Sequence, residues 1–235
     1  MRMKRADYGL DAPGVVRNMG MVGISLAVVA TVPPVGPGLK SAATWMSISF
    51  LLSAFAMIAS SRFGKMKARD SLLDAVAVKP TDIVLDVGCG RGLLLMGAAK
   101  RATSGRAIGI DLWSNVDQKN NSRDATVANG EAEGVSDRIE VKDGDMRSLP
   151  FADASIDAVV SSLAIHNVKS EAERDTAIRE IVRVLKAGGR VGILDIANVS
   201  HYAKTLEASG MRVTSGPRIT PWIFPPSRIV VAIKQ

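Results

Sequence analysis

The residues best suited to chemistry surround a glycine-rich turn before the middle of the chain. A short β-branched run ends in Asp86, and the segment GCGRG, residues 88–92, separates it from a helix-forming stretch. Glycines let a backbone approach a ligand that side chains would obstruct, and a helix N-terminus presents N–H groups to a carboxylate. Strand, glycine turn and helix therefore predict a ligand site at the end of this strand.

A second carboxylate, Asp111, ends the next predicted strand. It follows the glycine turn by about 20 residues, the spacing at which an acid accepts hydrogen bonds from ribose hydroxyls. A dinucleotide site would favour the spacing G-x-G-x-x-G, yet Leu93 stands where the last glycine would fall. The pattern thus favours a nucleoside ligand, and the alternative for Asp86 and Asp111 is capping of the turns that they precede.

Apolar runs of strand length alternate with amphipathic segments through the last two thirds of the chain. We predict a helix over 70–78, strands over 82–87 and 106–110, and two final strands over 211–215 and 228–233. This alternation is typical of βαβ units in an α/β fold with a mostly parallel sheet. The single cysteine excludes an internal disulfide, and no Cys/His cluster has zinc-site spacing, so we expect no metal.

The N-terminal third contains two uncharged apolar stretches, 19–32 and 41–61, joined by the turn VPPVGPG. A helix needs roughly 17–25 residues to cross a bilayer, which the first stretch reaches only by including Val15, Val16 and part of the turn. We expect a transmembrane hairpin that contacts membrane lipid through residues 15–61. A cleaved signal peptide, and a hairpin packed on the globular domain or lying in the membrane interface, remain open alternatives.

The formal net charge of +7 is concentrated in residues 1–69, which hold nine basic and two acidic residues. The remaining residues are formally neutral, so we expect no nucleic-acid partner. Basic residues flank the hairpin, whereas the connection between its two apolar stretches contributes only Lys40. The flanking basic residues are Arg2, Lys4, Arg5, Arg62, Lys65, Lys67 and Arg69. This asymmetry predicts a multi-pass cell-membrane protein with its globular domain, residues 70–235, on the cytoplasmic side. Small residues such as Ser49 and Ser53 suggest a homo-oligomer formed through the hairpin.

Several ordered motifs carry a family resemblance. The segment VLDVGCGRG, 84–92, resembles the first motif of class I S-adenosylmethionine-dependent methyltransferases, and GIDLW, 109–113, resembles their acidic ribose motif. Residues 143–168 resemble the adenine motif and fourth strand, and 179–195 the helix, Gly-Gly turn and fifth strand. The chain is most similar to small-molecule methyltransferases related to ubiquinone and menaquinone biosynthesis.

This resemblance implies a Rossmann-like, seven-stranded, mostly parallel sheet with helices on both faces, preceded by an N-terminal α-helical hairpin. It divides the chain into a hairpin domain, 1–69, and a methyltransferase domain, 70–235. The last two strands would be terminal antiparallel strands. The loop between them, with Trp222, Ile223 and Phe224, would give the acceptor site an apolar wall or contact the membrane, unless it only packs as a hairpin.

The resemblance also implies S-adenosyl-L-methionine as cofactor. The implied cofactor-binding residues are Asp86, Gly88, Cys89, Gly90, Asp111, Leu112, Asp145, Met146 and Ser161. Asp86 and the glycine backbones would face the methionine part and Asp111 the ribose, with Cys89 a small apolar filler. Asp145 would take the adenine amino group beside Met146, although a solvated turn and a core methionine are the alternative. Ser161 would approach the methionine part.

His166 is the predicted catalytic residue, because the segment AIHNV follows the fourth strand at the expected sulfonium position. It would act as a base or contact the acceptor; the alternative is a histidine that caps the next helix through Asn167. The predicted function is membrane-anchored methyl transfer to a lipophilic small molecule, such as a quinone precursor, an isoprenoid or another lipid. An RNA or protein methyltransferase, and a non-catalytic cofactor-binding membrane protein, are the alternative functions.

Overall fold

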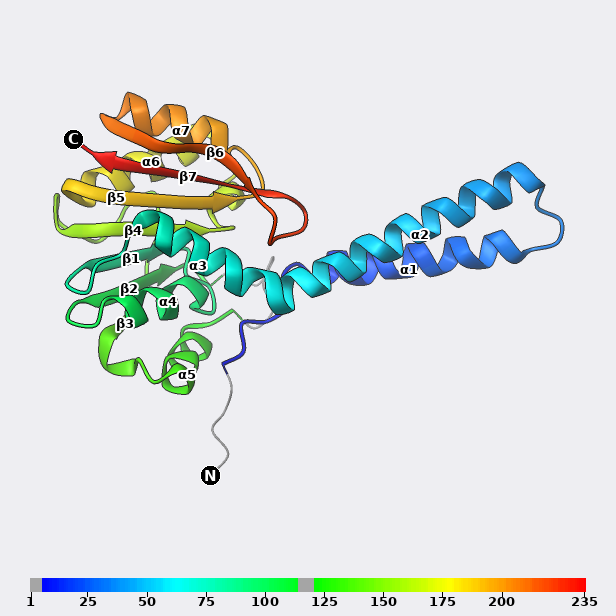
Figure 1. The fold of residues 1–235 in the computed structure, drawn as a ribbon, viewed down its shortest axis with the longest axis horizontal. Coiled ribbons are helices and arrows are strands. Elements are labelled where there is room, and N and C mark those ends of the chain that lie inside the picture. Colours follow the sequence, from blue (N-terminus) through cyan, green and yellow to red (C-terminus); the bar gives the residue numbers. More distant parts are fainter. Residues whose placement is uncertain (1–5, 114–120) are drawn as a thin grey trace.

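A computed structural model of the chain describes residues 6–113 and 121–235. A layered α/β domain carries a long helical hairpin that projects from one end (Figure 1). Arg2, Lys4 and Arg5, which the sequence assigns to a basic flank, lie outside the described residues.

The domain is built on a seven-stranded sheet in the order β3-β2-β1-β4-β5-β7-β6. Its strands are β1 (Ile83–Val87), β2 (Arg106–Asp111), β3 (Ile139–Asp143), β4 (Ile156–Ser162), β5 (Leu185–Asp195), β6 (Met211–Thr220) and β7 (Ser227–Lys234). Neighbouring strands from β3 to β5 pair in parallel, whereas β7 runs antiparallel to both β5 and β6. The predicted Rossmann-like fold class is confirmed, with β7 as the reversed strand among those described.

Helices cover both faces of the sheet. They are α3 (Lys65–Val76), α4 (Leu93–Arg101) and α5 (Arg123–Glu133) on one side, and α6 (Glu171–Val184) and α7 (Val199–Ala208) on the other (Figure 1). Alternate residues of β1 serve the two layers: Leu85 and Val87 join the core beneath α6 and α7, and Val84 packs with α3 and α4. Burial on both faces explains the continuous apolar character of this strand.

The edge strand β6 is longer than the sequence predicts. We expected a loop to begin at residue 216, but the strand continues to Thr220 through Pro217. Register shifts on either side of Ser215 accommodate the proline, which cannot donate to a sheet ladder and is tolerated on an edge strand. The remaining connection, 221–226, is therefore a short tight loop, which we call the β6–β7 loop.

The hairpin consists of α1 (Pro13–Thr31) and α2 (Pro37–Ala59), close to the predicted spans. The prediction of two separate helices, one ending near residue 61 and the next beginning at residue 70, was wrong. The chain stays helical through a π-helical turn (Ser60–Gly64) into α3. The expected domain boundary at residues 69 and 70 thus falls inside α3. One rigid rod connects the hairpin to the helix layer of the domain.

The two hairpin helices pack closely along their length. Ser47 Oγ donates to the carbonyl of Gly23 at 2.7 Å, and a Cβ on Gly23 would lie 2.8 Å from Leu51. The packed face of α2 also includes Ala43 and Ala54 rather than the exposed Ser49. Small residues thus mediate the approach of α1, and the exposed Ser49, which the sequence assigns to a homo-oligomer contact, takes no part in it.

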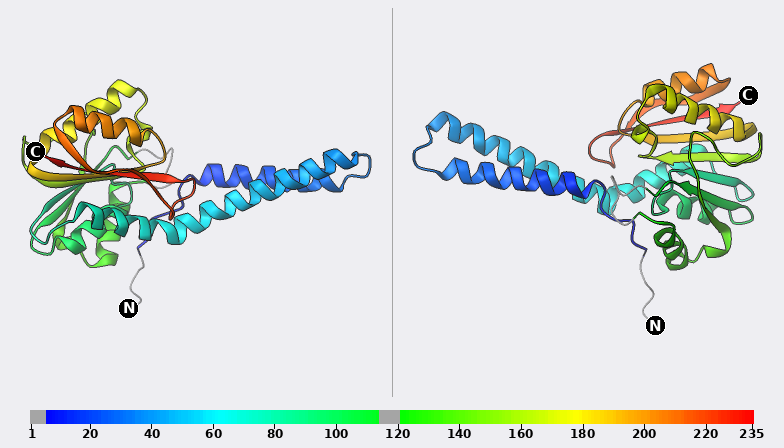
Figure 2. Two further views of the ribbon diagram at one scale, coloured as in Figure 1. Left: turned by 45° about the horizontal axis from the view of Figure 1, so that its top comes forward. Right: turned by 180° about the vertical axis from the view of Figure 1, so that it is seen from behind.

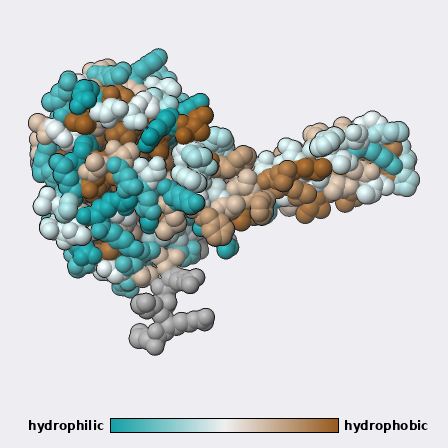
Figure 3. All heavy atoms as spheres, viewed as in Figure 1, coloured by the Kyte–Doolittle hydropathy of each residue, from teal (hydrophilic) through white to brown (hydrophobic). Residues whose placement is uncertain are grey.

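The hairpin points away from the domain in every view (Figures 1 and 2). Packing of its length against the globular domain, one of the sequence alternatives, is therefore wrong. Apolar residues follow its flank down to the base, while the domain surface is largely hydrophilic (Figure 3). Both helices are long and apolar enough to cross a membrane, and 11% and 17% of their apolar windows are buried.

The β6–β7 loop docks on the π-helical turn at the hairpin base. Trp222 places its backbone carbonyl so close to Gly64 that a Cβ there would lie 1.8 Å from the oxygen. The amide of Phe224 donates to Ser60 Oγ at 3.2 Å, and the Lys67 ammonium lies 4.6 Å from the Trp222 ring centre. The hairpin and the sheet edge are thus joined at this point.

Replacing Gly64 with alanine should break this contact, because the new methyl group overlaps the Trp222 carbonyl. We expect the free energy of unfolding in detergent micelles to fall by roughly 1–3 kcal/mol, the usual cost of overpacking. Gly216→Ala is the matched control, since no atom lies within 4 Å of its added Cβ. Equal thermal stability of the two variants would contradict the contact.

Candidate active site

The carboxyl ends of the parallel strands meet at one edge of the sheet, beside the hairpin base. A cavity of about 810 Å³ opens there, within the size range typical of small-molecule sites. Nine of the ten predicted site residues line it: Asp86, Gly88, Cys89, Gly90, Asp111, Leu112, Asp145, Met146 and His166. The structure therefore brings together residues up to 80 positions apart in the chain.

Asp111 and the glycine turn lie side by side, as predicted. The amide of Gly90 donates to Asp111 Oδ2 at 2.8 Å, and the amide of Trp113 donates to Oδ1 at 2.7 Å. The amides of Gly88 and Cys89 both donate to the Ile110 carbonyl, at 2.9 and 3.0 Å. The end of β2 therefore satisfies these three turn amides, and the predicted N–H groups for a ligand carboxylate belong to the N-terminus of α4, which begins at Leu93.

The glycines instead provide room. Gly88 has a φ of +74°, and a Cβ there would lie 2.3 Å from the side chain of Ala164. A side chain at this position would also reach the methyl group of Met146, 3.6 Å away, on the cavity wall. Cys89 is buried, and burial raises the pKa of its thiol well above the usual range, consistent with an apolar filler.

Asp86 is the most unusual group in the cavity wall. Its carboxylate is 1% exposed, and neither oxygen has a hydrogen-bond partner among the described residues. Burial, reinforced by the charge of Asp111, raises the pKa of Asp86 to about 8, although the nearby Leu95 amide opposes this shift without reaching hydrogen-bond geometry. A buried carboxylate of this kind suits a cationic ligand, and the ammonium group of S-adenosylmethionine fits it.

The predicted adenine side of the cavity is formed by Asp145 and Met146, which packs partly into the core. Arg147 donates to both oxygens of Asp145 at 2.6 to 3.0 Å and lowers the pKa of this carboxyl. A carboxylate has further lone pairs, so this pairing keeps Asp145 ionised without closing it to a ligand. Leu112 lies at the cavity rim with 64% of its surface exposed.

The assignment of Ser161 to the site was wrong. Its hydroxyl is buried and donates to the Val87 carbonyl at 2.8 Å, so it ties β4 to β1. Side chains alternate along a strand, and it is the neighbouring Ser162 that lines the cavity.

His166 is paired with a buried carboxylate. Its Nδ1 lies 2.5 Å from Asp195 Oδ1, and its backbone amide donates to Oδ2 at 3.1 Å. Asp195 also accepts from the Ile196 amide. Because the Asp195 carboxylate acts as an acceptor in these contacts, we assign the proton of the imidazole ring to Nδ1. The Nε2 lone pair then points away from Asp195. The alternative role as a helix cap is wrong, because Ser170 caps α6.

The sequence analysis missed an N-terminal strap, residues 6–12, that forms another wall of the cavity. Asn129 exchanges hydrogen bonds with the backbone of Asp7 at 2.8 and 3.0 Å. The buried Lys65 ammonium donates to the carbonyls of Tyr8 and Gly9 at 2.8 and 2.6 Å. These partners lie 56 to 122 residues apart, and no local pattern signals such contacts.

Comparison with known proteins identifies methyltransferases as similar to this chain. Residues 85–193 match a family model described as a methyltransferase domain. A demethylmenaquinone methyltransferase from Lactobacillus johnsonii is 34% identical over 130 residues, which cover 54% of this chain and 49% of that protein. A ubiquinone/menaquinone biosynthesis C-methyltransferase from a Ruegeria species is 31% identical over 131 residues, covering 56% and 49%.

The fold agrees with this sequence match. The crystal structure of a SAM-dependent methyltransferase from Aquifex aeolicus superimposes with a TM-score of 0.57 at 19% identity, covering 73% of this chain and 97% of that one. Residues 85–193 are therefore similar to a methyltransferase domain, the globular part has the fold of a SAM-dependent methyltransferase, and its cavity residues fit S-adenosylmethionine as cofactor. Within that class, it is similar to the ubiquinone and menaquinone biosynthesis group, although it spans about half the length of those relatives.

Cofactor binding should release a proton from Asp86. At pH 7 a carboxyl with a pKa of about 8 is mostly protonated, and pairing with an ammonium group requires its ionised form. Affinity should therefore rise with pH up to about 8 and level off above it. Calorimetry at pH 7 in buffers of different ionisation enthalpy should detect the release of about one proton. Asp86→Asn should abolish the release, whereas wild-type affinity that is flat between pH 6 and 9 would refute the assignment.

Asp111→Ala should weaken cofactor binding by tenfold or more. The ribose hydroxyls lose a charged acceptor worth roughly 1.5–3 kcal/mol per bond, and the glycine turn loses its contact with β2. Asp143→Ala is a suitable control, because Asp143 ends the adjacent strand outside the cavity and accepts from the Trp113 ring nitrogen. If calorimetry gave equal dissociation constants for the two variants, Asp111 would have no place in the site.

Proposed function

We propose that this protein is a membrane-anchored methyltransferase that transfers a methyl group from S-adenosylmethionine to a lipophilic quinone precursor. The observation that carries this proposal is one cavity lined both by the cofactor residues and by the hairpin base, including Val15 and Met57. The named relatives, a demethylmenaquinone methyltransferase and a ubiquinone/menaquinone biosynthesis C-methyltransferase, support a quinone-type acceptor.

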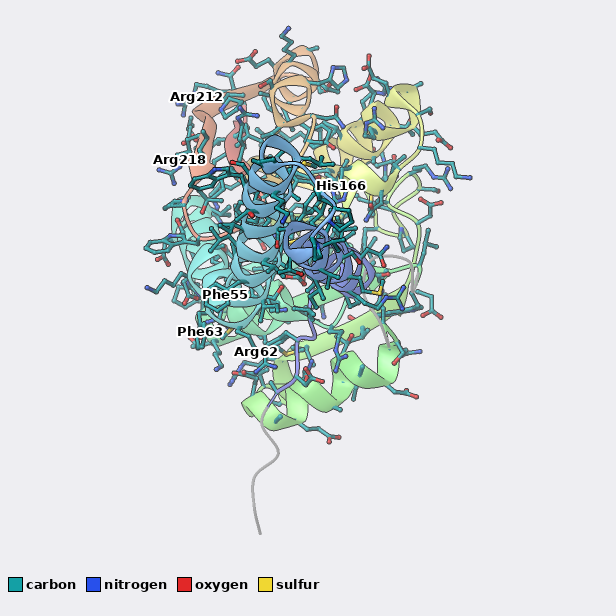
Figure 4. All side chains as sticks on the ribbon, turned by 90° about the vertical axis from the view of Figure 1, so that its right-hand side faces the viewer. Phe55, Arg62, Phe63, His166, Arg212 and Arg218 are labelled. Carbon is teal, nitrogen blue, oxygen red and sulfur yellow. The ribbon has the colours of Figure 1, made fainter. Side chains whose placement is uncertain are left out.

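Membrane anchoring is supported by the exposure of the hairpin. A helix of 19 residues extends about 28 Å, close to the thickness of a bilayer core. Large apolar side chains project from α2, such as Leu52 and Phe55, and burying them in lipid would remove them from water. Arg62 and Phe63 lie together at the hairpin base, a combination that suits the interface (Figure 4). With basic residues at the base and Lys40 at the tip, the catalytic domain would face the cytoplasm.

The chemistry requires alignment and a base. The cofactor supplies an activated methyl group when bound, and the chain must hold the acceptor in line with it and exclude water. His166 is placed to accept a proton at Nε2 from a phenolic hydroxyl or an acidic carbon of the acceptor, since Asp195 holds Nδ1–H. The acceptor atom gains the methyl group, its proton passes to His166, and S-adenosylhomocysteine leaves. Asp195 would stabilise the resulting imidazolium.

The direct test supplies purified full-length protein in phosphatidylcholine nanodiscs with methyl-labelled S-adenosylmethionine and a demethylated naphthoquinol that carries a long prenyl tail. We expect labelled methyl in the lipid phase. Label that passes to soluble acceptors, but to no component of a membrane lipid extract, would overturn the proposal.

His166→Gln should lower kcat in the same assay by about 10²–10⁴-fold, the usual contribution of a positioned base, while cofactor affinity stays unchanged. His201→Ala is the control, because His201 of α7 pairs with Asp175 of α6 and does not line the cavity. Equal kcat values for the two variants would remove the catalytic role of His166.

A further inference from the structure

Part of the rim of the cofactor cavity is apolar. Four large apolar side chains line the cavity and are also exposed: Val15 (49%), Leu112 (64%), Ile196 (40%) and Phe224 (38%). Exposed apolar side chains around the mouth of a site mark an interaction surface, because leaving them in water is unfavourable. The cavity interior near Asp86 and Asp111 is polar by contrast, so it has two chemically different ends.

The apolar end is built from the hairpin base and the β6–β7 loop. Val15 lies on the first turn of α1 and Met57 near the end of α2, and both line the cavity. Phe224 completes this wall, because its amide is bonded to Ser60 Oγ, one turn beyond Met57. We call Val15, Met57 and Phe224 the tail wall.

The tail wall is continuous with the surface proposed to contact lipid. Val15, Val22 and Val29 follow one another at seven-residue intervals along α1, which places them on one side of the helix, and all three are exposed. Viewed along the hairpin, His166 lies on the face of the domain from which the helices rise (Figure 4). A molecule with its polar ring near His166 could therefore extend its tail past the hairpin base without crossing water.

We propose that the tail wall is the specificity site for the hydrocarbon tail of the acceptor, which passes from the bilayer into the cavity between α1 and the β6–β7 loop. This inference rests on the proposed function for the identity of the ring. It assigns the occupant to an extended hydrocarbon chain, because the wall offers apolar side chains where a second polar group would need partners. Cofactor and ring then occupy the polar end of the cavity.

The test compares two demethylated naphthoquinols that differ only in tail length, one with a single prenyl unit and one with eight. Val15→Asp places a charge in the tail wall at a half-exposed position that tolerates a polar residue. We expect kcat/KM for the long-tailed acceptor to fall about tenfold or more, and for the short-tailed acceptor to change less than about twofold. Phe224→Ala should shift the ratio in the same direction.

Val127→Asp provides the control. Val127 is 38% exposed on α5 and does not line the cavity, so both acceptors should keep wild-type kcat/KM. Unchanged cofactor affinity of Val15→Asp, measured by calorimetry, would show that the variant is folded. An equal fall in kcat/KM for both acceptors in Val15→Asp, or no fall for the long-tailed acceptor, would overturn the assignment of the tail wall.

A crosslinking measurement separates this inference from the proposed function. Wild-type protein in phosphatidylcholine nanodiscs is irradiated with the long-tailed naphthoquinol carrying a diazirine in its tail, and modified peptides are identified by mass spectrometry. Labels on peptides containing Val15, Met57 or Phe224 would support the tail wall even if no methyl group is transferred. Failure of methyl transfer would overturn only the proposal that this naphthoquinol is the methyl acceptor. Labels confined to the outer hairpin surface would overturn the tail wall even if methylation occurs.

Discussion

The structure depends on how the end of β2 holds the glycine turn after β1. The Ile110 carbonyl and the Asp111 carboxylate accept hydrogen bonds from three consecutive turn amides, Gly88 to Gly90. These bonds fix the turn in backbone conformations that glycine adopts readily, and they leave Asp86 facing an open cavity. The carboxylate expected to bind ribose is therefore also the group that shapes the rest of the site.

This arrangement explains why the cavity can combine opposite chemical environments. Asp86 is buried without a partner among the described residues, which is unfavourable unless a cation binds there. The opposite side of the cavity is closed by the strap and the hairpin base, where Val15 and Met57 accompany polar groups such as Lys65, which backbone carbonyls satisfy. The cavity thus has a charged end that fits a sulfonium amino acid and a partly apolar end that fits the proposed lipophilic acceptor.

The sequence predicted features that arise from local rules. The period of apolar residues predicted a mostly parallel sheet, and the family resemblance implied its seven strands and the cofactor residues, nine of which line one cavity with His166 included. The resemblance placed Ser161 in the site, but one residue of register decides whether a hydroxyl faces the cavity or the neighbouring strand, and Ser161 faces the strand. The hydrogen bonds from the turn amides to β2 were not predicted, since their acceptor on β2 is set by tertiary packing.

What the sequence could not predict are contacts between distant segments. Asn129 fastening the strap, and Trp222 lying over Gly64, depend on pairs separated by more than 100 residues, and neither has a local signature. The helical continuity from α2 into α3 was missed because the basic residues from Arg62 to Arg69 were interpreted as the flank that follows a membrane helix. In the structure, Gly64 within this segment instead admits the β6–β7 loop.

Hydrogen–deuterium exchange of the full-length protein in nanodiscs, with and without S-adenosylmethionine, tests the central claim most directly. If the glycine turn and the end of β2 grip one ligand, the cofactor should slow exchange together in peptides covering 86–92 and 109–113, at one common concentration dependence. Protection of one of these segments without the other, or of neither at saturating cofactor, would contradict the account.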